Sequence, residues 1–452
     1  MEIPEVIELI RANIIGTKFA EKSFLVGGFV RDLLLKQASD DIDIVVELPD
    51  GGRELAKFLH EKGIASHPVI YDNFGTALVN IGEHKIEFVM TRRESYRAKN
   101  RKPDVLFGSL REDVFRRDFT INSLIQDLVS GEILDLSGKG LSDLKDGIIR
   151  STSQPEIIFK EDPLRLLRAV RFTNRFHFSL EEQTRQGILK NAEMLDYISW
   201  ERRRDELLKM LIESDPVPAL EMLVEFGLMP YLIPELLPMI GLAQGRKHCS
   251  DAWGHTMLVL QNTRPDQKLR LAALLHDIGK PLVRSENETG IHFYHHENAG
   301  TKLASKILTR LKIPSDLSRD ILLLIRLHMR LKQSGKKAEI ISDAALRRLI
   351  VQAGSSLDLL LELIHADNLS HATEFNLPDQ IAQVTARLKP LVEEIIKHNL
   401  PLTGKDLILR FGLEPGEEIG NLLDKATEIW LESPQIKKEE LLMKLEKEVN
   451  HG

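Results

Sequence analysis

The chain has 452 residues, of which 61 are Lys or Arg and 68 are Asp or Glu, so its formal net charge is −7. Apolar residues make up 42% of the chain, enough for folded cores, and the length suggests about three domains. The single cysteine, Cys249, excludes an internal disulfide and a zinc or iron–sulfur site built from cysteines of one chain. We expect no signal peptide and no membrane span, hence a cytoplasmic protein. The mild acidity argues weakly against a nucleic-acid partner.

The first stretch, to about residue 150, has the pattern of a mixed α/β domain. Short apolar strands are expected at 23–26 and 42–46, with an amphipathic helix from about 29 to 35 between them. The segments 77–81 and 85–90 are expected to pair as two strands joined by a tight turn.

From about residue 155 onward, Leu, Ile and Ala recur at three- and four-residue spacing, which predicts helices. The expected fold class is α+β, with a small α/β head containing a mixed sheet, followed by a long all-helical body. The charged segment 437–448 is expected to be a solvated amphipathic helix. The expected divisions are a head at 1–150, a neck at 151–215, a helical body at 216–250, a domain with its own chemistry at 251–370 and a helical tail at 371–452.

Two features of the head suggest phosphate and metal chemistry. Gly27 and Gly28 end a strand and open a helix, where a backbone without Cβ atoms can approach a phosphate near free N–H groups. Asp41 and Asp43 are two apart on an expected strand, so both side chains should lie on one face, where they repel unless a cation lies between them. Mg²⁺ prefers a few carboxylates together with substrate phosphates. Either feature alone is more often a plain turn or a solvated strand end.

In this order and spacing, GG-x-VRD followed by DIDI resembles the nucleotidyltransferase superfamily, in the branch of tRNA nucleotidyltransferases (CCA-adding enzymes) and bacterial poly(A) polymerases. The resemblance implies a nucleotidyltransferase head in which Asp41 and Asp43 bind Mg²⁺ and act in catalysis. It implies a nucleotide-binding role for Gly27, Gly28 and Arg31. Glu87, on a neighbouring expected strand, is a candidate third carboxylate or a solvated strand residue.

Two further segments resemble motifs of the same family. EDVFRRDFTIN (residues 112–122) matches the part that contacts the sugar and phosphates, and EDPLRLLRAVRF (residues 161–172) matches the neck. Arginine forks suit a triphosphate and an aspartate can accept hydrogen bonds from ribose hydroxyls. The resemblance therefore implies that the following residues bind nucleotide: Arg116, Arg117, Asp118, Asn122, Asp162, Arg165, Arg168 and Arg171.

The neck arginines recur every three or four residues, and with Arg175 they form a stripe about 120° wide on an α-helix. Such a stripe should repel itself unless it meets an anion; the alternative is a solvated helix face. ERRRDELL (residues 201–208) lies where the family reads the base with an Asp and an Arg, commonly in the form Glu-Asp-x-x-Arg. This segment departs from that form, so Arg202 and Asp205 are the expected base readers.

Residues 92–117 contain nine basic and four acidic side chains, a local excess of five positive charges in an acidic protein. This excess fits a loop that reaches toward phosphate or RNA. The expected RNA-binding residues are Arg92, Arg97, Lys99, Arg101 and Lys102.

A second chemical site is expected in the helical body. RLAALLHDIGKP ends an apolar helical run with His276 and Asp277; His255 comes 21 residues earlier and Asp367 lies in a further helix. Histidine and aspartate together suit Mg²⁺, Mn²⁺, Fe or Ni²⁺. The series resembles the HD phosphohydrolase superfamily, which implies a metal site at His255, His276, Asp277 and Asp367, with His296 and His328 as additional ligands. A single His-Asp pair would more often be structural.

The leading expectation is a template-independent enzyme that adds C, A or both from CTP and ATP to the 3′ end of tRNA. The resemblance also implies that the helical body and the tail at 371–452 hold the acceptor end of tRNA. Full CCA addition and CC-only or A-only addition stay open, as does oligomeric state. A poly(A) polymerase with the same head is one alternative. The others are an HD phosphohydrolase or cyclic phosphodiesterase as the main activity, and a catalytically silent RNA-binding protein, which the intact carboxylates disfavour.

Overall fold

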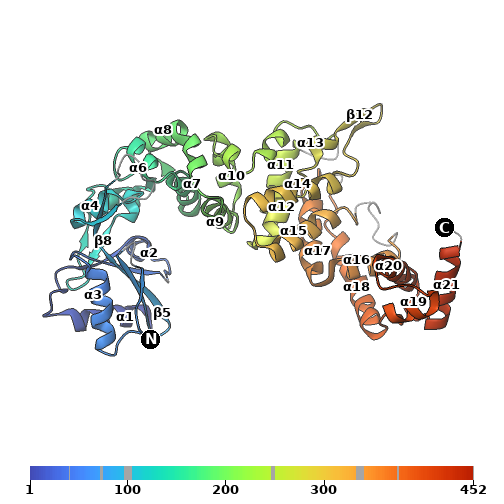
Figure 1. The fold of residues 1–452 in the computed structure, drawn as a ribbon. Helices are drawn as coiled ribbons and strands as arrows, with labels where there is room; N and C mark the ends of the chain where they lie inside the picture. The colour runs from blue at the N-terminus through green and yellow to red at the C-terminus, as the bar shows by residue number, and fades with distance from the viewer. Residues whose placement is uncertain are drawn as a thin grey trace. The chain divides into compact units, whose positions relative to one another are not determined.

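The computed structural model describes residues 1–39, 41–71, 75–95, 104–245, 250–331, 341–373 and 376–450. The chain folds into two compact units (Figure 1). The first unit holds residues 1–206 and 221–231, and the second holds 207–220 and 232–452.

The first unit is built on a seven-stranded sheet in the order β3-β4-β5-β2-β1-β8-β9. Among its described strands, only β2 and β5 pair in parallel, so the sheet is mixed as expected. The four expected strands are confirmed, with ends within one residue, and three more complete the sheet. The strands are β1 (Ser23–Val26), β2 (Ile42–Val46), β3 (Val69–Tyr71), β4 (Thr76–Ile81), β5 (His84–Met90), β8 (Ile125–Asp127) and β9 (Ile133–Leu134).

Strand β2 lies inside the sheet between β5 and β1, which explains its almost continuous apolar sequence. Ile42, Ile44, Val45 and Val46 are buried, and Asp43 is the one residue of β2 that is partly exposed. The strand therefore places a single carboxylate on a surface of the sheet and anchors it with four apolar neighbours.

Helices cover this sheet and extend the unit beyond it. The helix expected between the first two strands is confirmed as α2, and the helical pattern after residue 155 is confirmed by the helices that follow. The helices around the sheet are α1 (Ile3–Ile14), α2 (Gly28–Leu34), α3 (Gly51–Glu61), α4 (Leu110–Phe115) and α5 (Gly140–Asp146). The following helices are α6 (Pro155–Glu161), α7 (Leu164–Phe176), α8 (Glu182–Asn191), α9 (Trp200–Leu211) and α10 (Val217–Glu225), of which α9 and α10 are shared between the units.

Within its described residues, the second unit is helical apart from a short hairpin of β12 (Ser285–Asn287) and β13 (Gly290–His292). Helices α11, α12, α15 and α17 pack together around its core. Its helices before the tail are α11 (Ala252–Gln261), α12 (Gln267–Leu275), α13 (Lys280–Val283), α14 (His296–Arg310), α15 (Ser315–Leu327), α16 (Asp343–Ala353) and α17 (Leu357–Leu369).

One stretch of the described residues, Asp343–Leu369, is long and apolar enough to cross a membrane by length and composition alone. It comprises α16, a 3₁₀ turn and α17, and half of its most apolar window is buried. A core helix passes the same test, and α17 packs against α11, α12 and α15.

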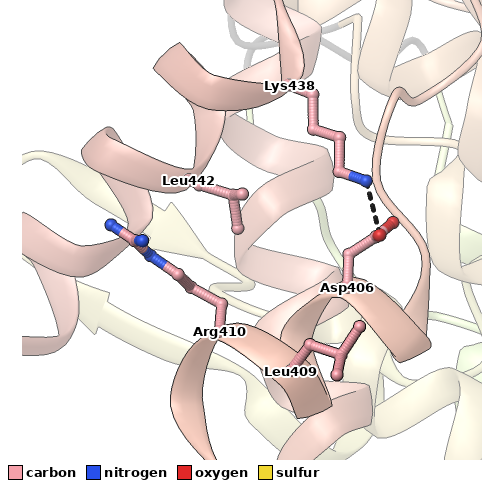
Figure 2. A pocket seen from close by; sticks show the side chains of 5 residues that line it. All are labelled: Asp406, Leu409, Arg410, Lys438 and Leu442. Carbon is pink, nitrogen blue, oxygen red and sulfur yellow. Dashed lines mark hydrogen bonds and ion pairs between the residues drawn. The ribbon is translucent and has the colours of Figure 1, made fainter.

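The tail begins with α18 (Gln380–Lys397) and has an apolar core that includes buried residues of α19 (Gly404–Phe411), α20 (Glu417–Glu432) and α21 (Lys438–Asn450). Ile395 of α18 packs against this core. Leu441 and Leu445 of α21 are buried in that core, so the expected amphipathic helix is confirmed. A pocket of about 250 Å³ lies between α19 and α21, where Lys438 Nζ is 2.5 Å from Asp406 Oδ1 (Figure 2).

Candidate functional site

The carboxylates of the head gather at the end of β2. Strands β2 and β5 pair with Asp43 opposite Glu87, and Asp41 lies just before β2, which begins at Ile42. Burial raises the pKa of Asp43 to about 6, and the charges of Glu87 and Asp41 add to this while Arg117 opposes it. A buried carboxylate with further carboxylates beside it belongs to a donor set suited to a divalent cation.

The turn at Gly27 brings its own backbone and the guanidinium group of Arg117 close to Asp43. Gly27 has φ of +71°, a conformation that a side chain would strain. A Cβ atom at Gly27 would lie 3.5 Å from Arg117 Nη1 and 3.7 Å from Asp43 Oδ2, so the arginine, the carboxylate and the backbone face one corner. Gly28 opens α2, and Arg31 of the same helix lies against it. The expected grouping of Gly27, Asp43 and Arg117 is thus present in the structure.

Sequence reasoning missed the residue that orients the two adjacent arginines. Asp113 of α4 is buried, and its Oδ1 accepts two hydrogen bonds from Arg116, at 2.9 and 2.6 Å from Nε and Nη2. Its Oδ2 accepts two from Arg117, at 3.2 and 2.8 Å. Burial opposes ionisation of Asp113, but the two guanidinium groups outweigh it and lower its pKa. The three- and four-residue spacing from Asp113 to the arginines was the available signal.

We expect Asp113→Asn to lower the free energy of unfolding by about 3 kcal/mol, because it leaves two guanidinium groups without their shared carboxylate. Urea denaturation at pH 7 measures this, with the exposed Glu132→Gln of the same sheet region as the control. Equal unfolding free energies for the Asp113 variant and wild type would contradict the assignment.

A second series of side-chain hydrogen bonds joins four of the expected nucleotide-binding residues. Arg31 Nη1 donates to Asn122 Oδ1 at 2.5 Å, and Asn122 Nδ2 donates to Asp118 Oδ1 at 3.0 Å. Arg168 Nε donates to Asp118 Oδ2 at 2.7 Å. Burial would raise the pKa of Asp118, but Arg168 and the hydrogen bonds to the carboxylate outweigh it and lower the pKa to about 2.

The arginine stripe was expected to need an anion, and carboxylates of the protein itself supply it. Arg168 pairs with Asp118, and Arg171 Nε donates to Glu206 Oε2 at 2.6 Å. Arg165 is buried and donates to the backbone carbonyls of Ile158 and Arg116. The arginines of the stripe therefore largely bind carboxylates and carbonyl groups of the protein itself. Of these three arginines, Arg168 has the most exposed side chain, at 31%.

The two expected base readers lie on the exposed side of α9 but do not pair with each other. Arg202 Nη2 donates to Asp162 Oδ2 at 2.8 Å, whereas Asp205 accepts from Arg204. Asp162 is held on its other oxygen by the backbone N–H of Leu164 at 3.2 Å. The form Glu-Asp-x-x-Arg also occurs at residues 161–165, so the aspartate that meets Arg202 comes from that earlier segment.

Much of the basic segment lies outside the described residues, including Arg97, Lys99, Arg101 and Lys102. Its described ends form a two-stranded ribbon of β6 (Arg92–Ser95) and β7 (Asp104–Phe107). The backbone N–H of Arg92 donates to Asp113 at 3.3 Å, which places Arg92 beside the Arg116–Arg117 cluster.

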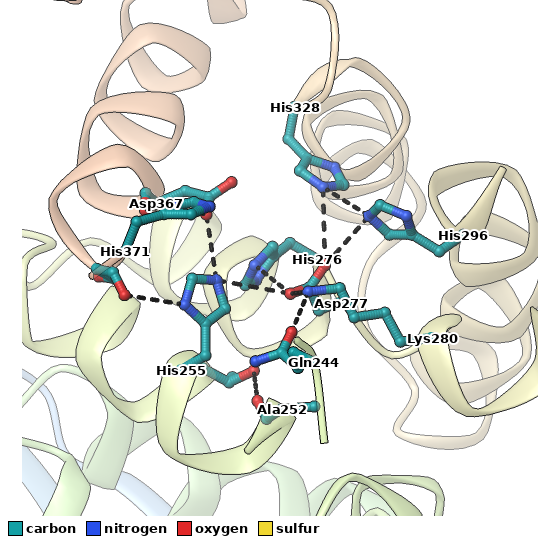
Figure 3. Close-up of polar contacts among 12 residues, drawn as sticks. Gln244, Ala252, His255, His276, Asp277, Lys280, His296, His328, Asp367 and His371 are labelled. Carbon is teal, nitrogen blue, oxygen red and sulfur yellow. Dashed lines mark hydrogen bonds and ion pairs between the residues drawn. The ribbon is translucent and has the colours of Figure 1, made fainter. Parts of the chain in front are cut away.

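Six buried side chains of the second unit converge as Figure 3 shows, and all six were expected from the sequence. They form two groups of three, and within each group the ligand atoms lie within 4.8 Å of one another. Asp277 faces both groups: Oδ2 is 3.1 Å from His276 Nε2 and 3.6 Å from His255 Nε2, and Oδ1 is 3.2 Å from His296 Nε2. The groups are His255, His276 and Asp367, and Asp277, His296 and His328.

Backbone carbonyls orient the imidazoles of this cluster. His276, His296 and His328 each contact, through Nδ1, the carbonyl oxygen three residues earlier, at 2.7, 2.8 and 2.6 Å. A carbonyl only accepts hydrogen bonds, so Nδ1 carries a proton and Nε2 faces the centre. Burial, aided by neighbouring imidazoles, keeps the pKa of His328 well below its ordinary value, which favours the neutral form that binds metals.

The residue types, their convergence and the oriented Nε2 atoms fit a divalent metal at this centre. Sequence reasoning missed the nearby Lys280, although it lies in the same HDIGKP segment. Its Nζ is 2.5 Å from Asp277 Oδ2 and also contacts Gln244. Gly279 is required here, because a Cβ would collide with the His296 carbonyl at the start of α14.

Three family models match the chain in order. They are the poly(A) polymerase head domain over residues 23–150, the probable RNA and SrmB-binding site of polymerase A over 177–240, and the HD domain over 248–364. Together with the two clusters they define a nucleotidyltransferase-type head followed by an HD domain, a combination that implies divalent metal use.

The A-adding tRNA nucleotidyltransferase of Deinococcus radiodurans is 32% identical over 422 residues, which cover 90% of each chain. The CC-adding tRNA nucleotidyltransferase of Thermus thermophilus is 31% identical over 435 residues, or 92% of each. The chain belongs to the tRNA nucleotidyltransferase and poly(A) polymerase family. A structure of the Bacillus stearothermophilus CCA-adding enzyme in complex with CTP aligns over 100% of this chain and 99% of that chain, with a TM-score of 0.71 and 24% identity, and shows the same fold.

Proposed function

We propose that the protein is a template-independent tRNA nucleotidyltransferase that adds C, A or both from CTP and ATP to the tRNA 3′ end and releases pyrophosphate. The observation that carries this proposal is the corner where Asp43, Arg117 and Gly27 meet beside Asp41 and Glu87. The full-length relatives are named as A-adding and CC-adding enzymes, which supports tRNA as the acceptor. Addition of nucleotides to tRNA would place the protein in the cytoplasm.

In this reaction the 3′ hydroxyl of the RNA attacks the α-phosphate of the nucleotide, and the bond to pyrophosphate breaks. Asp41 and Asp43 would bind Mg²⁺, which when present activates the hydroxyl and stabilises the charge on the phosphates. Arg117 and Arg116, oriented by Asp113, would bind phosphate oxygens, and their planar guanidinium groups suit that task. Asp118 and Asn122 would position the ribose.

Base selection would fall to the Asp162–Arg202 pair, both of whose side chains reach solvent, at 31% and 48% exposure. A carboxylate accepts and a guanidinium donates. Cytosine and adenine each present an amino donor beside a ring-nitrogen acceptor, which complements this pair. Uracil and guanine present an acceptor beside a ring N–H donor, which does not.

The buried cluster in the second unit favours a second activity, metal-assisted hydrolysis of a phosphate ester. His255, His276, Asp277 and Asp367, with His296 and His328, would hold the metal ions, Mg²⁺, Mn²⁺ or Ni²⁺. Because these ligands lie in a different compact unit from Asp43, the two activities should separate by mutation.

The test offers purified protein three tRNA transcripts: one without CCA, one ending in CC and one complete, each with a single labelled nucleotide. We expect C or A to enter at least about 10-fold faster than U or G, since one well-placed polar pair discriminates by about 1–3 kcal/mol. The transcript extended identifies CCA, CC-only or A-only addition. Long adenylate tails on unrelated RNA would instead favour a poly(A) polymerase, and no addition to any transcript would refute the proposal.

A further inference from the structure

Tyr294 is an exposed aromatic residue close in sequence to the buried cluster of the second unit. Its relative exposure is 64%. A single exposed ring is common on protein surfaces, but this ring is held in a fixed orientation. It stacks on the imidazole of His292, with the ring centroids 5.1 Å apart and an angle of 9° between the planes. The tyrosine hydroxyl also lies 3.2 Å from His292 Nδ1, so both the ring and its polar end are fixed.

The hairpin of β12 and β13 in turn fixes His292. His292 Nε2 lies 2.7 Å from Thr289 Oγ1 and 3.1 Å from Asn287 Oδ1. Thr289 Oγ1 donates its own proton to Asn287 Oδ1 at 2.6 Å. A neutral His292 therefore carries its proton on Nε2 and accepts the tyrosine hydroxyl on Nδ1. These contacts hold one face of the Tyr294 ring against the protein, and its high exposure means that the other face meets solvent.

The chain around Tyr294 is anchored at the cluster of candidate metal ligands. The carbonyl oxygen of Phe293 accepts a hydrogen bond from His296 Nδ1 at 2.8 Å. The Phe293 ring lies 5.6 Å from Lys280 Nζ, which contacts Asp277. Tyr294 precedes His296 by two residues, so their Cα atoms are separated by at most about 7 Å. The exposed ring is thus within reach of a molecule that joins a flat base to a phosphate through one sugar.

We propose that Tyr294 is the base-binding residue of the second site, whose substrate is a nucleoside with the phosphate ester on its ribose. This inference rests on the hydrolysis proposed above for the buried cluster and adds its substrate class. The phosphate would lie at the cluster, and the base would stack on the exposed face of Tyr294. Every nucleobase has a π-face, so stacking favours nucleotides over sugar phosphates without choosing among the bases. Because the ring is already fixed, little side-chain entropy is lost when a base binds.

The test measures, by calorimetry with Mn²⁺ present, the binding of 3′-AMP and of ribose 5-phosphate, which has no base. Heat that disappears in Asp277→Asn is assigned to this site, which separates it from binding at the head. We expect Tyr294→Ala to weaken 3′-AMP binding about 10-fold and ribose 5-phosphate binding less than about twofold, the size expected for one base–aromatic contact. Tyr294→Phe keeps the ring and should weaken 3′-AMP binding less than about threefold.

Tyr197, a tyrosine of the first unit with 67% exposure, provides the matched control. Tyr197→Ala should leave both affinities within about twofold of wild type, and Mn²⁺ content should be equal in all three tyrosine variants. A five-nucleotide RNA with a 3′-phosphate identifies the source of the nucleoside. Binding tighter than that of 3′-AMP assigns the site to RNA ends, and equal or weaker binding assigns it to free nucleotides.

Unchanged affinity of Tyr294→Ala for 3′-AMP overturns the inference, as does equal affinity of wild type for 3′-AMP and ribose 5-phosphate. Loss of Mn²⁺ and of both ligands from Tyr294→Ala would show a structural role and overturns it as well. Absence of bound Mn²⁺ and of both phosphates in wild type would refute the proposed hydrolysis itself. That outcome differs from a metal-loaded protein that binds both phosphates and does not distinguish them by the base.

Discussion

Asp43→Asn should reduce nucleotide addition at least about 1,000-fold, while tRNA binding changes by less than about threefold. Asp43 is the partly exposed residue of a buried central strand, so the substitution removes a metal-binding carboxylate with little change in packing. Loss of an interaction that stabilises the transferring phosphate by several kcal/mol corresponds to a factor of this size. Steady-state addition and a filter-binding assay with the same transcript separate the two quantities.

The same variant has a control that does not depend on activity. Because the pKa of Asp43 is raised from 3.8 to about 6 in the folded protein, the native state binds the proton more tightly than the unfolded chain does. The contribution of Asp43 to wild-type stability without metal should therefore fall as pH rises from about 4 to 6, by up to about 3 kcal/mol. Asp43→Asn should lack this loss and be the more stable protein at pH 7. Equal stability across that window, together with normal addition, would contradict the assignment of Asp43.

The residues that sequence reasoning found are those whose chemistry is local or whose motif is continuous. Asp41 directly precedes a short apolar run and Asp43 lies inside it, and the buried neighbours of Asp43 explain why that run could be recognised. His276 and Asp277 end an apolar helix and needed only the other histidines for the metal cluster to be expected. In both cases the sequence itself places the functional side chains against a recognisable element.

The pairing of charges could not be found in this way, because it is set by packing between distant segments. The arginine stripe was expected to meet an anion, but its periodicity did not indicate that Arg168 and Arg171 would meet Asp118 and Glu206, which are 50 and 35 residues away. Arg202 was matched with Asp205 on its own helix, whereas its partner Asp162 is 40 residues earlier. Helical periodicity shows which side a residue occupies but not which segment covers that side.

Asp277→Asn should abolish metal binding by the buried cluster and lower any phosphate-ester hydrolysis at least about 100-fold. Asp277 directs Oδ2 toward His255 and His276 and Oδ1 toward His296, so one change removes a ligand from the middle of both groups. His328→Ala, by contrast, affects only the second group and should leave part of the metal in place. Metal content after dialysis against Mn²⁺ or Ni²⁺, and hydrolysis of a 2′,3′-cyclic nucleotide, measure the two effects.

Nucleotide addition is the internal control for this prediction, and Glu288→Gln on the exposed hairpin is the matched variant. Since Asp277 and Asp43 belong to different compact units, addition of C or A by Asp277→Asn should stay within about twofold of wild type. Full metal content and full hydrolysis in Asp277→Asn would contradict the assignment of Asp277 as a metal ligand. Loss of addition in a variant that still unfolds cooperatively would show that the two sites act as one, because a carboxylate in the second unit would then be needed for chemistry at Asp43.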